Sequence, residues 1–385
     1  MRQFATLKKE HVSESALANM PGVCAALGVE GTEVYMDDIL SRSELLYTDE
    51  AGKESWVREL EKLCVKRVHC AYWAYPTSFL TKHSFTELTE RFGSLKAVRE
   101  YYGDLTGGHM FRRWAQEYAL ASALGAQSYT YHLIDYAPID GMWDFSISRA
   151  DIRQAMVYMI QHFLNHLMDE GLLTEDSPQI ELENAGFGLE YGLQTAEDFA
   201  FLFEQLYDPM GKVKLGWDIN HLLHAVGFER EKGRGAFFLT EGEITPAMRE
   251  LEEKFGAEPA VFAVEWLRHN LLHPATAARI GGVQLSDCAL KETCYFRNGR
   301  FIEPYYGAIA ALPDWEAKED YGVRVVLSEY DSHVILGSGI LNGEEMRGLL
   351  QEAAVHSPDM VLLHELKNSH DMVGAVSMQI KNLGI

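Results

Sequence analysis

Residues 179–186 read Gln-Ile-Glu-Leu-Glu-Asn-Ala-Gly (QIELENAG), a largely apolar run that ends at Glu183 and then turns to small residues. Six more short apolar runs end in side chains that metal ions favour. They are His69 in RVHCAY, His132 in SYTYHL, Asp218 with His221 in LGWDINH, Gln284 with Asp287 in GVQLSD, Asp331 with His333 in SEYDSH, and Glu365 in MVLLHEL. Helical stretches separate these runs, so the pattern predicts strands whose C-terminal ends converge on one polar site.

The alternation of strand-like and helix-like segments predicts the fold class. Apolar periodicity places eight strands near residues 3, 33, 68, 130, 181, 216, 283 and 362. Alternating βα units in this number predict an α/β protein, a (β/α)8 TIM barrel formed by residues 1–385 as a single domain. Two connections, about 229–278 and 288–330, are too long for simple crossovers, and we expect insertions there on the C-terminal face. The second contains CYFRNGRFIEP, which is typical of a hairpin around Asn298-Gly299.

Composition and charge indicate which kinds of molecule are disfavoured as partners of the protein. The chain has 57 acidic and 34 basic side chains, a formal net charge of −23. Proteins that bind a polyanion usually present a basic surface, so this balance disfavours a nucleic-acid partner. No apolar run reaches the length of a membrane span, and MRQFATLKKEHVSES lacks the apolar core of a secretory signal. The five cysteines show no CxxC spacing, and we expect a cytoplasmic protein with no membrane partner.

Each polar motif has a functional and an ordinary explanation. A carboxylate at Glu183 fits a barrel mouth, and it equally fits a strand end that leads into a solvated loop. Asp218 and His221 are three residues apart and can face one centre, but this spacing often arises by chance. Asp331 and His333 share one side of an extended segment, which suits chelation by oxygen and nitrogen as well as it suits a polar loop.

The remaining strand ends are weaker signals when taken singly. A histidine at the end of an apolar strand, such as His69 or His132, is more often a core or loop residue with satisfied hydrogen bonds. Glu365 follows an apolar run, where a buried carboxylate needs a charge partner. A bound cation is the natural partner there, so the constellation is more informative than any of its members.

The constellation resembles the xylose isomerase-like TIM barrels, the superfamily that holds sugar isomerases and epimerases as well as endonuclease IV (AP endonuclease family 2). HCAY is similar to the HAPY motif of endonuclease IV, ELENAGFG to LLENTAGQG, DINHLLHAVG to DTCHAFAAG, and DSHVILGSGI to DRHENIGEGxI. The resemblance covers nearly the whole chain in strand order, apart from the two insertions. It implies metal ligands at His69, His132, Glu183, Asp218, His221, Asp331, His333 and Glu365.

The chain departs from this family at one position. The family's HLND motif reads QLSD here, so Gln284 replaces a histidine ligand. An amide oxygen can bind a hard cation but is a poorer zinc ligand than imidazole. The resemblance implies one to three divalent ions, zinc, manganese or magnesium. Its usual Glu-Asp-His-Glu set is also the single metal site of the sugar epimerases, and the corresponding residues here are Glu183, Asp218, Gln284 and Glu365.

Two mechanisms compete, and the acidic charge and the insertions favour the first. In that mechanism a metal ion binds the carbonyl and hydroxyl oxygens of a small carbohydrate or sugar phosphate, while Glu183 and Glu365 move protons as in an isomerase or epimerase. His221 would orient the substrate. Tyr72 and Trp73 could stack on the sugar ring, and both could equally pack against a helix.

The second mechanism is that of a multi-zinc phosphodiester hydrolase resembling endonuclease IV, in which two or three ions activate a water. In this mechanism His69, His132 and the group of His221, Asp331 and His333 all bind metal ions. Isomerisation does not require all of these residues. A third hypothesis is a non-catalytic barrel that binds a sugar. Barrels of this kind often associate through their outer helices, so a homo-oligomer is an expectation by analogy alone.

Overall fold

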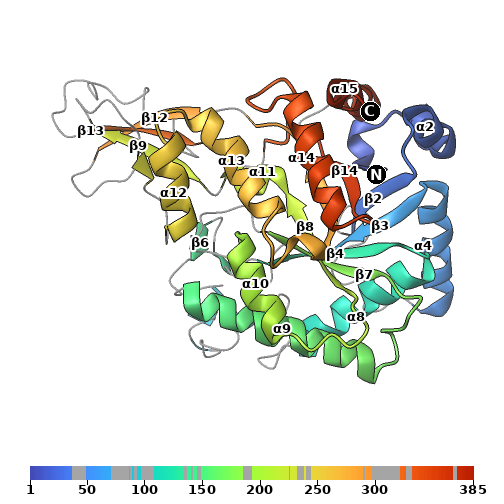
Figure 1. Cartoon of the computed structure of the whole chain (residues 1–385). Helices are drawn as coiled ribbons and strands as arrows, with labels where there is room; N and C mark the ends of the chain where they lie inside the picture. Colours follow the sequence, from blue (N-terminus) through green and yellow to red (C-terminus); the bar gives the residue numbers. More distant parts are fainter. Residues whose placement is uncertain are drawn as a thin grey trace.

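A closed barrel of eight parallel strands forms the centre of the molecule (Figure 1). The computed structural model describes residues 1–36, 49–70, 86, 89–90, 93–96, 108–133, 137–139, 142–144, 149–184, 193–224, 226–231, 238–239, 244–288, 291–296, 321–326, 332–366 and 371–385. The barrel confirms the predicted fold and all eight expected strand positions. In order around the barrel the strands are β1 (Arg2–Thr6), β2 (Gly31–Tyr35), β3 (Val65–His69), β4 (Ser128–Leu133), β7 (Gln179–Asn184), β8 (Val213–Asp218), β11 (Ile280–Leu285) and β14 (Val361–His364).

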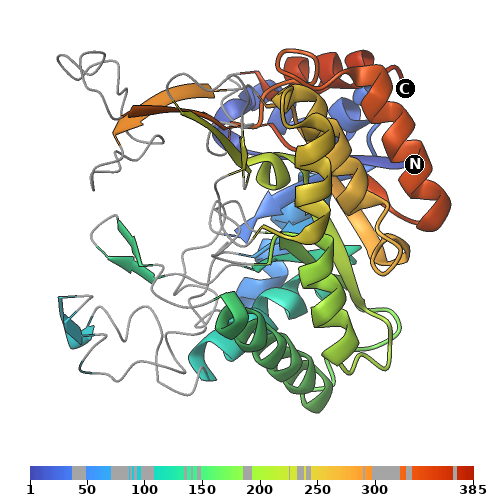
Figure 2. The same ribbon diagram turned by 60° about the vertical axis from the view of Figure 1, so that its left-hand side comes forward.

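Helices surround the barrel, as Figures 1 and 2 show. Side chains on the outer face of the strands, such as Leu182, Trp217 and Leu362, are fully buried against them. Trp266 of the helix Pro259–Leu271, which lies within the first expected insertion, is likewise fully buried. The described α-helices are α1 (Glu14–Leu17), α2 (Met20–Leu27), α4 (Glu50–Lys62), α8 (Gly108–Ala123), α9 (Arg149–Asp169), α10 (Ala196–Gln205), α11 (Ile219–His224), α12 (Pro246–Phe255), α13 (Pro259–Leu271), α14 (Gly343–His356) and α15 (Met372–Leu383).

Local sequence explains where several of these helices begin and end. Thr195 caps α10 with a capping box to Asp198, and the Asn342 side chain accepts the first free backbone N–H groups of α14. Gly28 ends α2 in a left-handed conformation, with φ of 73°, that glycine adopts at little cost. Within the described residues, no helix combines the length and apolar character that crossing a bilayer requires.

A second, smaller sheet joins segments from both expected insertions. Its four antiparallel strands are in the order β10 (Phe238–Leu239), β9 (Gly227–Glu231), β13 (Tyr321–Val326) and β12 (Lys291–Phe296). It projects to the upper left of the barrel in Figure 1. A separate hairpin comprises β5 (Ala137–Ile139) and β6 (Met142–Asp144). The turn expected at Asn298-Gly299 lies outside the described residues, and the described partner of β12 is β13.

The barrel interior has polar side chains in two layers, because alternate residues of a strand face the same side. Arg67 precedes His69 by two residues on β3, and Glu181 precedes Glu183 by two on β7. His69 and Glu183 therefore belong to an upper layer at the C-terminal ends of the strands. Arg67 and Glu181 belong to a lower layer, two residues closer to the N-terminal ends. The lower layer contains an ion pair between Arg67 and Glu181, with Nη1 3.1 Å from Oε1. The upper layer is the candidate site.

Candidate metal centre

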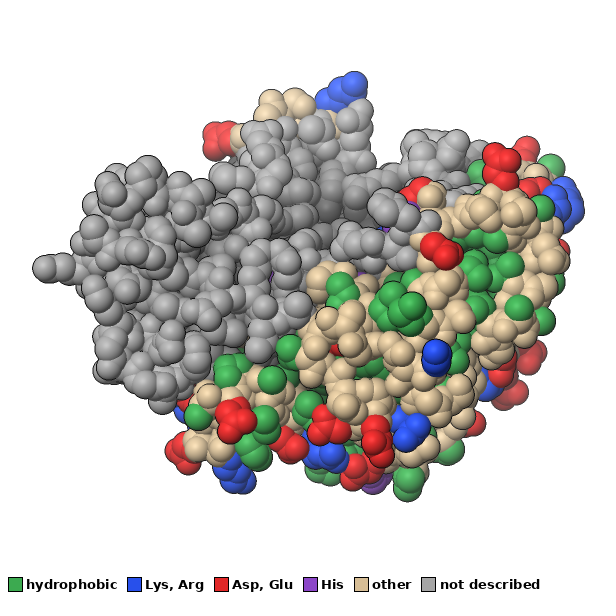
Figure 3. Space-filling view, turned by 90° about the horizontal axis from the view of Figure 1, so that it is seen from above, with side chains coloured by type: hydrophobic (Ala, Val, Ile, Leu, Met, Phe, Trp, Pro, Cys, Tyr) green, Lys and Arg blue, Asp and Glu red, His purple; other side chains and the backbone are tan. Residues whose placement is uncertain are grey.

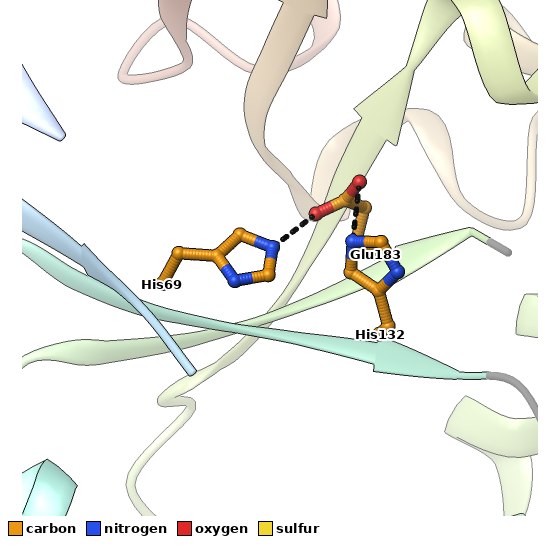
Figure 4. Close-up of side chains that lie close together, drawn as sticks. All are labelled: His69, His132 and Glu183. Carbon is orange, nitrogen blue, oxygen red and sulfur yellow. Dashed lines mark ion pairs between the residues drawn. The ribbon is translucent and has the colours of Figure 1, made fainter. Parts of the chain in front are cut away.

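The first cluster of the upper layer gathers around Glu183 of β7. Its Oε2 lies 3.3 Å from Nε2 of His69, and its Oε1 lies 3.0 Å from Nε2 of His132. The histidines come from β3 and β4, and His132 stands directly opposite Glu183 in the sheet register. Figure 4 shows both rings turned toward the carboxylate. One ligand atom from each residue lies within 4.8 Å of the other two, and all three side chains are buried.

The second cluster gathers around Asp218, the last residue of β8. Its Oδ2 lies 3.6 Å from Nε2 of His221, in the first turn of α11, and 3.7 Å from Nε2 of His333. These three residues are also buried and also bring their ligand atoms within 4.8 Å of one another. Nδ1 of His221 lies 3.3 Å from Oε1 of Glu183, so the two clusters adjoin.

Backbone carbonyls fix the orientation of two of these imidazoles. Nδ1 of His69 lies 3.0 Å from the carbonyl oxygen of Cys70, and Nδ1 of His221 lies 3.0 Å from that of Asn184. A carbonyl only accepts hydrogen bonds, so in each ring Nδ1 carries a proton and Nε2 is the nitrogen that faces the centre and can bind an ion there. Metal-binding histidines are typically oriented in this way.

Gln284, where the chain departs from the family motif, contacts Glu183 directly. Its side-chain Nε2 donates to Oε2 of Glu183 over 2.8 Å. Its Oε1 is buried and has no hydrogen-bond partner among the described residues. Gln284 therefore steadies the carboxylate of the first cluster and retains an oxygen that a hard cation can bind.

The donor atoms of the centre fit a divalent metal ion. Oε1 of Gln284 is buried without a hydrogen-bond partner in the described part of the chain, and Nε2 of His69 and Oδ2 of Asp218, also buried, have only the ion-pair contacts given above and no hydrogen bond there. Leaving such atoms unpaired costs free energy, and buried polar groups in proteins are rarely left so. Nitrogen and oxygen donors in this mixture suit zinc and related divalent ions.

Burial and the imidazoles set the protonation states of the first cluster. Burial alone would raise the pKa of Glu183, but His132, His221 and His69 hold that pKa well below its ordinary value. Burial lowers the pKa of His132 to about 4, although Glu183 opposes the change. At neutral pH Glu183 is therefore ionised and His132 is neutral, as metal binding requires. Burial would lower the pKa of His69, but Cys70 and Glu183 raise that pKa well above its ordinary value, so an ion that binds there must displace a proton.

Glu365 follows β14 and is held by a residue that the strand-end pattern missed. The hydroxyl of Tyr35 donates to Oε1 of Glu365 over 2.6 Å. Tyr35 is the last residue of β2, in register with His69 at the end of β3. The sequence pattern does not include Tyr35, because a phenol is not a typical metal ligand. Its position at a strand end is the signal that could identify it.

Asp287 is one of the polar residues that follow the predicted strands, but its carboxylate accepts hydrogen bonds from backbone N–H groups. Oδ1 accepts hydrogen bonds from the N–H groups of Cys288 and Leu341, at 2.7 and 2.9 Å. Oδ2 accepts from Gly337 and Gly339, both at 2.8 Å. Asp287 therefore clamps the segment 332–341, which carries His333.

His333 has a backbone conformation that few residues other than glycine adopt. Its φ is +39°, in the left-handed region, and its side chain is fully buried. Nδ1 lies 3.3 Å from Oγ of Ser286, which leaves Nε2 facing Asp218. Strained backbone of this kind persists only where surrounding contacts enforce it, and it is frequent at functional sites.

The lower layer was not anticipated from the sequence. Arg67 contacts Glu181 and also donates through Nε to Oε2 of Glu33 over 3.2 Å. A Cβ atom at Gly282 would lie 2.8 Å from Oε2 of Glu181, so only glycine leaves room for this network. Charged residues inside strands usually face solvent, and the sequence has no signal that distinguishes these from exposed ones.

Three residues predicted for the site, Asp331, Tyr72 and Trp73, lie outside the described residues. The structure brings together the remaining predicted ligands. Six of them form the two clusters, and Gln284 and Glu365 lie next to these clusters. The full set is His69, His132, Glu183, Asp218, His221, Gln284, His333 and Glu365.

Comparison with known proteins finds similar structures but no similar sequences. The sequence matches no protein-family model and no curated protein. The fold is similar to a candidate xylose isomerase from Rhodospirillum rubrum, with a TM-score of 0.51, 12% identity, and coverage of 100% of this chain and 98% of that one. It is also similar to a D-tagatose 3-epimerase-like protein, with a TM-score of 0.50, 14% identity, and coverage of 100% and 97%.

An endonuclease IV from Thermus thermophilus gives a TM-score of 0.48, with 14% identity and coverage of 100% and 99%. At these identities the comparisons concern the fold alone. The first two likenesses agree with the fold implied by the motifs. This chain has the fold of the xylose isomerase-like TIM barrels.

Proposed function

We propose that the chain is a metal-dependent hydrolase that binds at least two divalent ions at the barrel mouth and cleaves a phosphodiester in a small, sugar-containing substrate. The observation that carries the proposal is the surroundings of Glu183. Its Oε1 is contacted by His132 and His221, and its Oε2 by His69 and Gln284. A carboxylate enclosed in this way suits a metal bridge.

The same enclosure disfavours Glu183 as the proton-transferring base of an isomerase. A general base must reach the proton that it removes from the substrate, and both oxygens of Glu183 are engaged by neighbouring side chains. Its pKa, lowered by the imidazoles, also makes it a weak proton acceptor at neutral pH. The sequence favoured isomerase chemistry, and these contacts support the hydrolase instead.

Each cluster would hold one ion through its own residues. His69, His132 and Glu183 form one ligand set, and Asp218, His221 and His333 form the other. Four imidazoles favour zinc over magnesium or manganese. When bound, paired divalent ions supply Lewis acidity that lowers the pKa of water and stabilises charge on a phosphate.

The charge of the protein supports a small substrate over a nucleic acid. The net charge is −23. On the face seen in Figure 3, the described Lys and Arg side chains are scattered among acidic ones and form no continuous patch. A long polyanion would find little electrostatic attraction on such a surface, whereas a small phosphodiester needs only the metal centre.

Metal analysis and turnover of a generic substrate test the proposal. We expect purified protein to bind two or more zinc equivalents and to hydrolyse bis(p-nitrophenyl) phosphate. Asp218→Asn and His132→Ala should each lower kcat/KM by at least about 100-fold, because the first replaces a charged carboxylate ligand with a neutral amide and the second removes an imidazole. His269→Ala is the control, since that histidine pairs with Glu197 on the helices α13 and α10, outside both clusters.

Two results would contradict the hydrolase: a single bound ion, or full activity in Asp218→Asn. The second candidate is the sugar isomerase or epimerase, which the buried amide oxygen of Gln284 favours because hard ions such as manganese accept amide ligands. One ion replaceable by manganese, together with exchange of a ketose C–H for solvent deuterium, would support that candidate.

A further inference from the structure

Tyr35 is placed among the polar strand ends of the barrel without being a typical metal ligand itself. It ends β2, and its Cα pairs with that of His69 across the parallel ladder to β3. The neighbouring strand ends contribute His69, His132 and Glu183 to the first cluster. Tyr35 therefore occupies at the end of β2 the position that His69 occupies on the adjacent strand β3.

The side chain of Tyr35 contacts two members of the site. Its hydroxyl donates to Oε1 of Glu365 over 2.6 Å. Its ring centroid lies 4.1 Å from that of His69, with an angle of 34° between the ring planes. One residue thus touches an imidazole of the first cluster and the carboxylate that follows β14.

The bond to Glu365 has the length of a strong, charge-assisted hydrogen bond. Bonds from a hydroxyl to a carboxylate at about 2.5–2.7 Å are about twice as strong as those between neutral groups. A glutamate side chain has several rotatable bonds, and a partner fixed to one oxygen selects a rotamer and distinguishes the two oxygens. The face of the Tyr35 ring limits the tilt of His69 in the same way.

We propose that Tyr35 is a positioning residue of the metal centre, which orients Glu365 through its hydroxyl and His69 through its ring. The inference rests on the proposed function only in requiring that the centre binds metal. Outer groups that hydrogen-bond to ligands typically change metal affinity or activity by about 10–100-fold when they are removed.

The chain contains a matched pair for comparison. Tyr129 of β4 donates from its hydroxyl to Oε2 of Glu117 in α8, over 2.9 Å, and both residues are buried. That pair joins the barrel wall to a helix, and neither residue belongs to either cluster. It shares the chemistry of the Tyr35–Glu365 pair and differs in location.

The test compares Tyr35→Phe with Tyr129→Phe in the full-length, zinc-loaded protein. We measure zinc affinity by competition with a chromophoric chelator, the number of bound ions, and hydrolysis of bis(p-nitrophenyl) phosphate. Tyr35→Phe should weaken zinc binding or lower kcat by about 10–100-fold, whereas Tyr129→Phe should leave both at wild-type values and affect only thermal stability.

A double-variant comparison with Glu365→Gln separates positioning from general loosening. If Tyr35 acts through Glu365, Tyr35→Phe should add little to the loss already caused by Glu365→Gln. Wild-type zinc affinity and kcat in Tyr35→Phe, or additive losses in the double variant, would overturn the inference. Protein that binds zinc normally but hydrolyses no phosphodiester would contradict the proposed function alone, because the affinity comparison needs no turnover.

Discussion

Glu33 shows how the environment of a single residue changes the chemistry of the barrel interior. It lies in the lower layer, fully buried, and shares the guanidinium of Arg67 with Glu181. Burial raises the pKa of Glu33 to about 7 although Arg67 opposes the change, and the nearby carboxylates of Glu365 and Glu181 add to the increase. One cation shared by two buried acids does not compensate both charges fully.

This raised pKa predicts a pH-dependent loss of stability. A carboxyl whose pKa is higher in the folded state contributes stability that is fully present below its unfolded pKa, near 4.5, and is lost as pH rises through about 7. We expect Glu33→Gln to remove that decline, a change on the order of 1–3 kcal/mol in the free energy of unfolding. Denaturant titrations across this pH range measure it, with exposed Glu30→Gln as the control; parallel curves for Glu33→Gln and wild type would refute it.

At the scale of elements, the segment 332–341 is a short irregular connection that is held by hydrogen bonds to distant side chains. The Asp287 carboxylate accepts three backbone N–H groups of this segment, from Gly337, Gly339 and Leu341, and the side chain of Gln379 in α15 accepts the N–H of Leu336. Gly339 lies so close to the backbone of Cys288 that a Cβ atom would be 2.0 Å from its carbonyl oxygen. These contacts fix the unusual backbone of His333.

Removing the clamp should therefore affect the second cluster more than the first. We expect Asp287→Ala to cost at least about 3 kcal/mol, because several buried N–H groups lose their acceptor. Among molecules that remain folded, the protein should bind one ion fewer, through loss of His333. Asp371→Ala provides the control, since Asp371 caps α15 and belongs to neither cluster. Full metal content in folded Asp287→Ala would show that the clamp does not position His333.

The sequence predicted the barrel and much of the centre for a physical reason. Parallel strands bring their C-terminal ends to one edge, so His69, Glu183 and Asp218 could be expected to meet without knowledge of the helices. It could not predict that Asp287 turns to the backbone, or that the amide of Gln284 donates to a carboxylate. Those roles depend on neighbours that are distant in sequence, and the residue type alone allows either outcome.

At the scale of the whole molecule, negative charge and metal binding are linked. A net charge of −23 destabilises the compact state by self-repulsion, and two of the carboxylates that contribute to it, Glu183 and Asp218, are buried in the clusters. Divalent ions that bind only the folded state relieve part of this repulsion and stabilise it by mass action.

Thermal unfolding with and without zinc tests this link. At about 100 times its Kd, a bound ion should add about 2.7 kcal/mol to the free energy of unfolding, and a chelator should reverse the gain. Sodium chloride is the control, because it screens surface charge without occupying the clusters. Equal increases in Tm from zinc and from sodium chloride at matched ionic strength would exclude a specific metal effect, as would a full zinc response in Asp218→Asn.

The barrel closes between β1 and β14, its first and last strands in the sequence, and this determines the order in which its contacts can form during synthesis. The hydrogen bond between Tyr35 and Glu365 joins residues 330 positions apart, and the ligands of the first cluster are spread from β3 to β7. A growing chain can pair its first strands long before β14 leaves the ribosome, yet it cannot assemble the full centre. All six ligands of the two clusters precede β14 in the chain, so the closing strand adds Glu365 and its hydrogen bond to Tyr35 after the residues of both clusters have been synthesised.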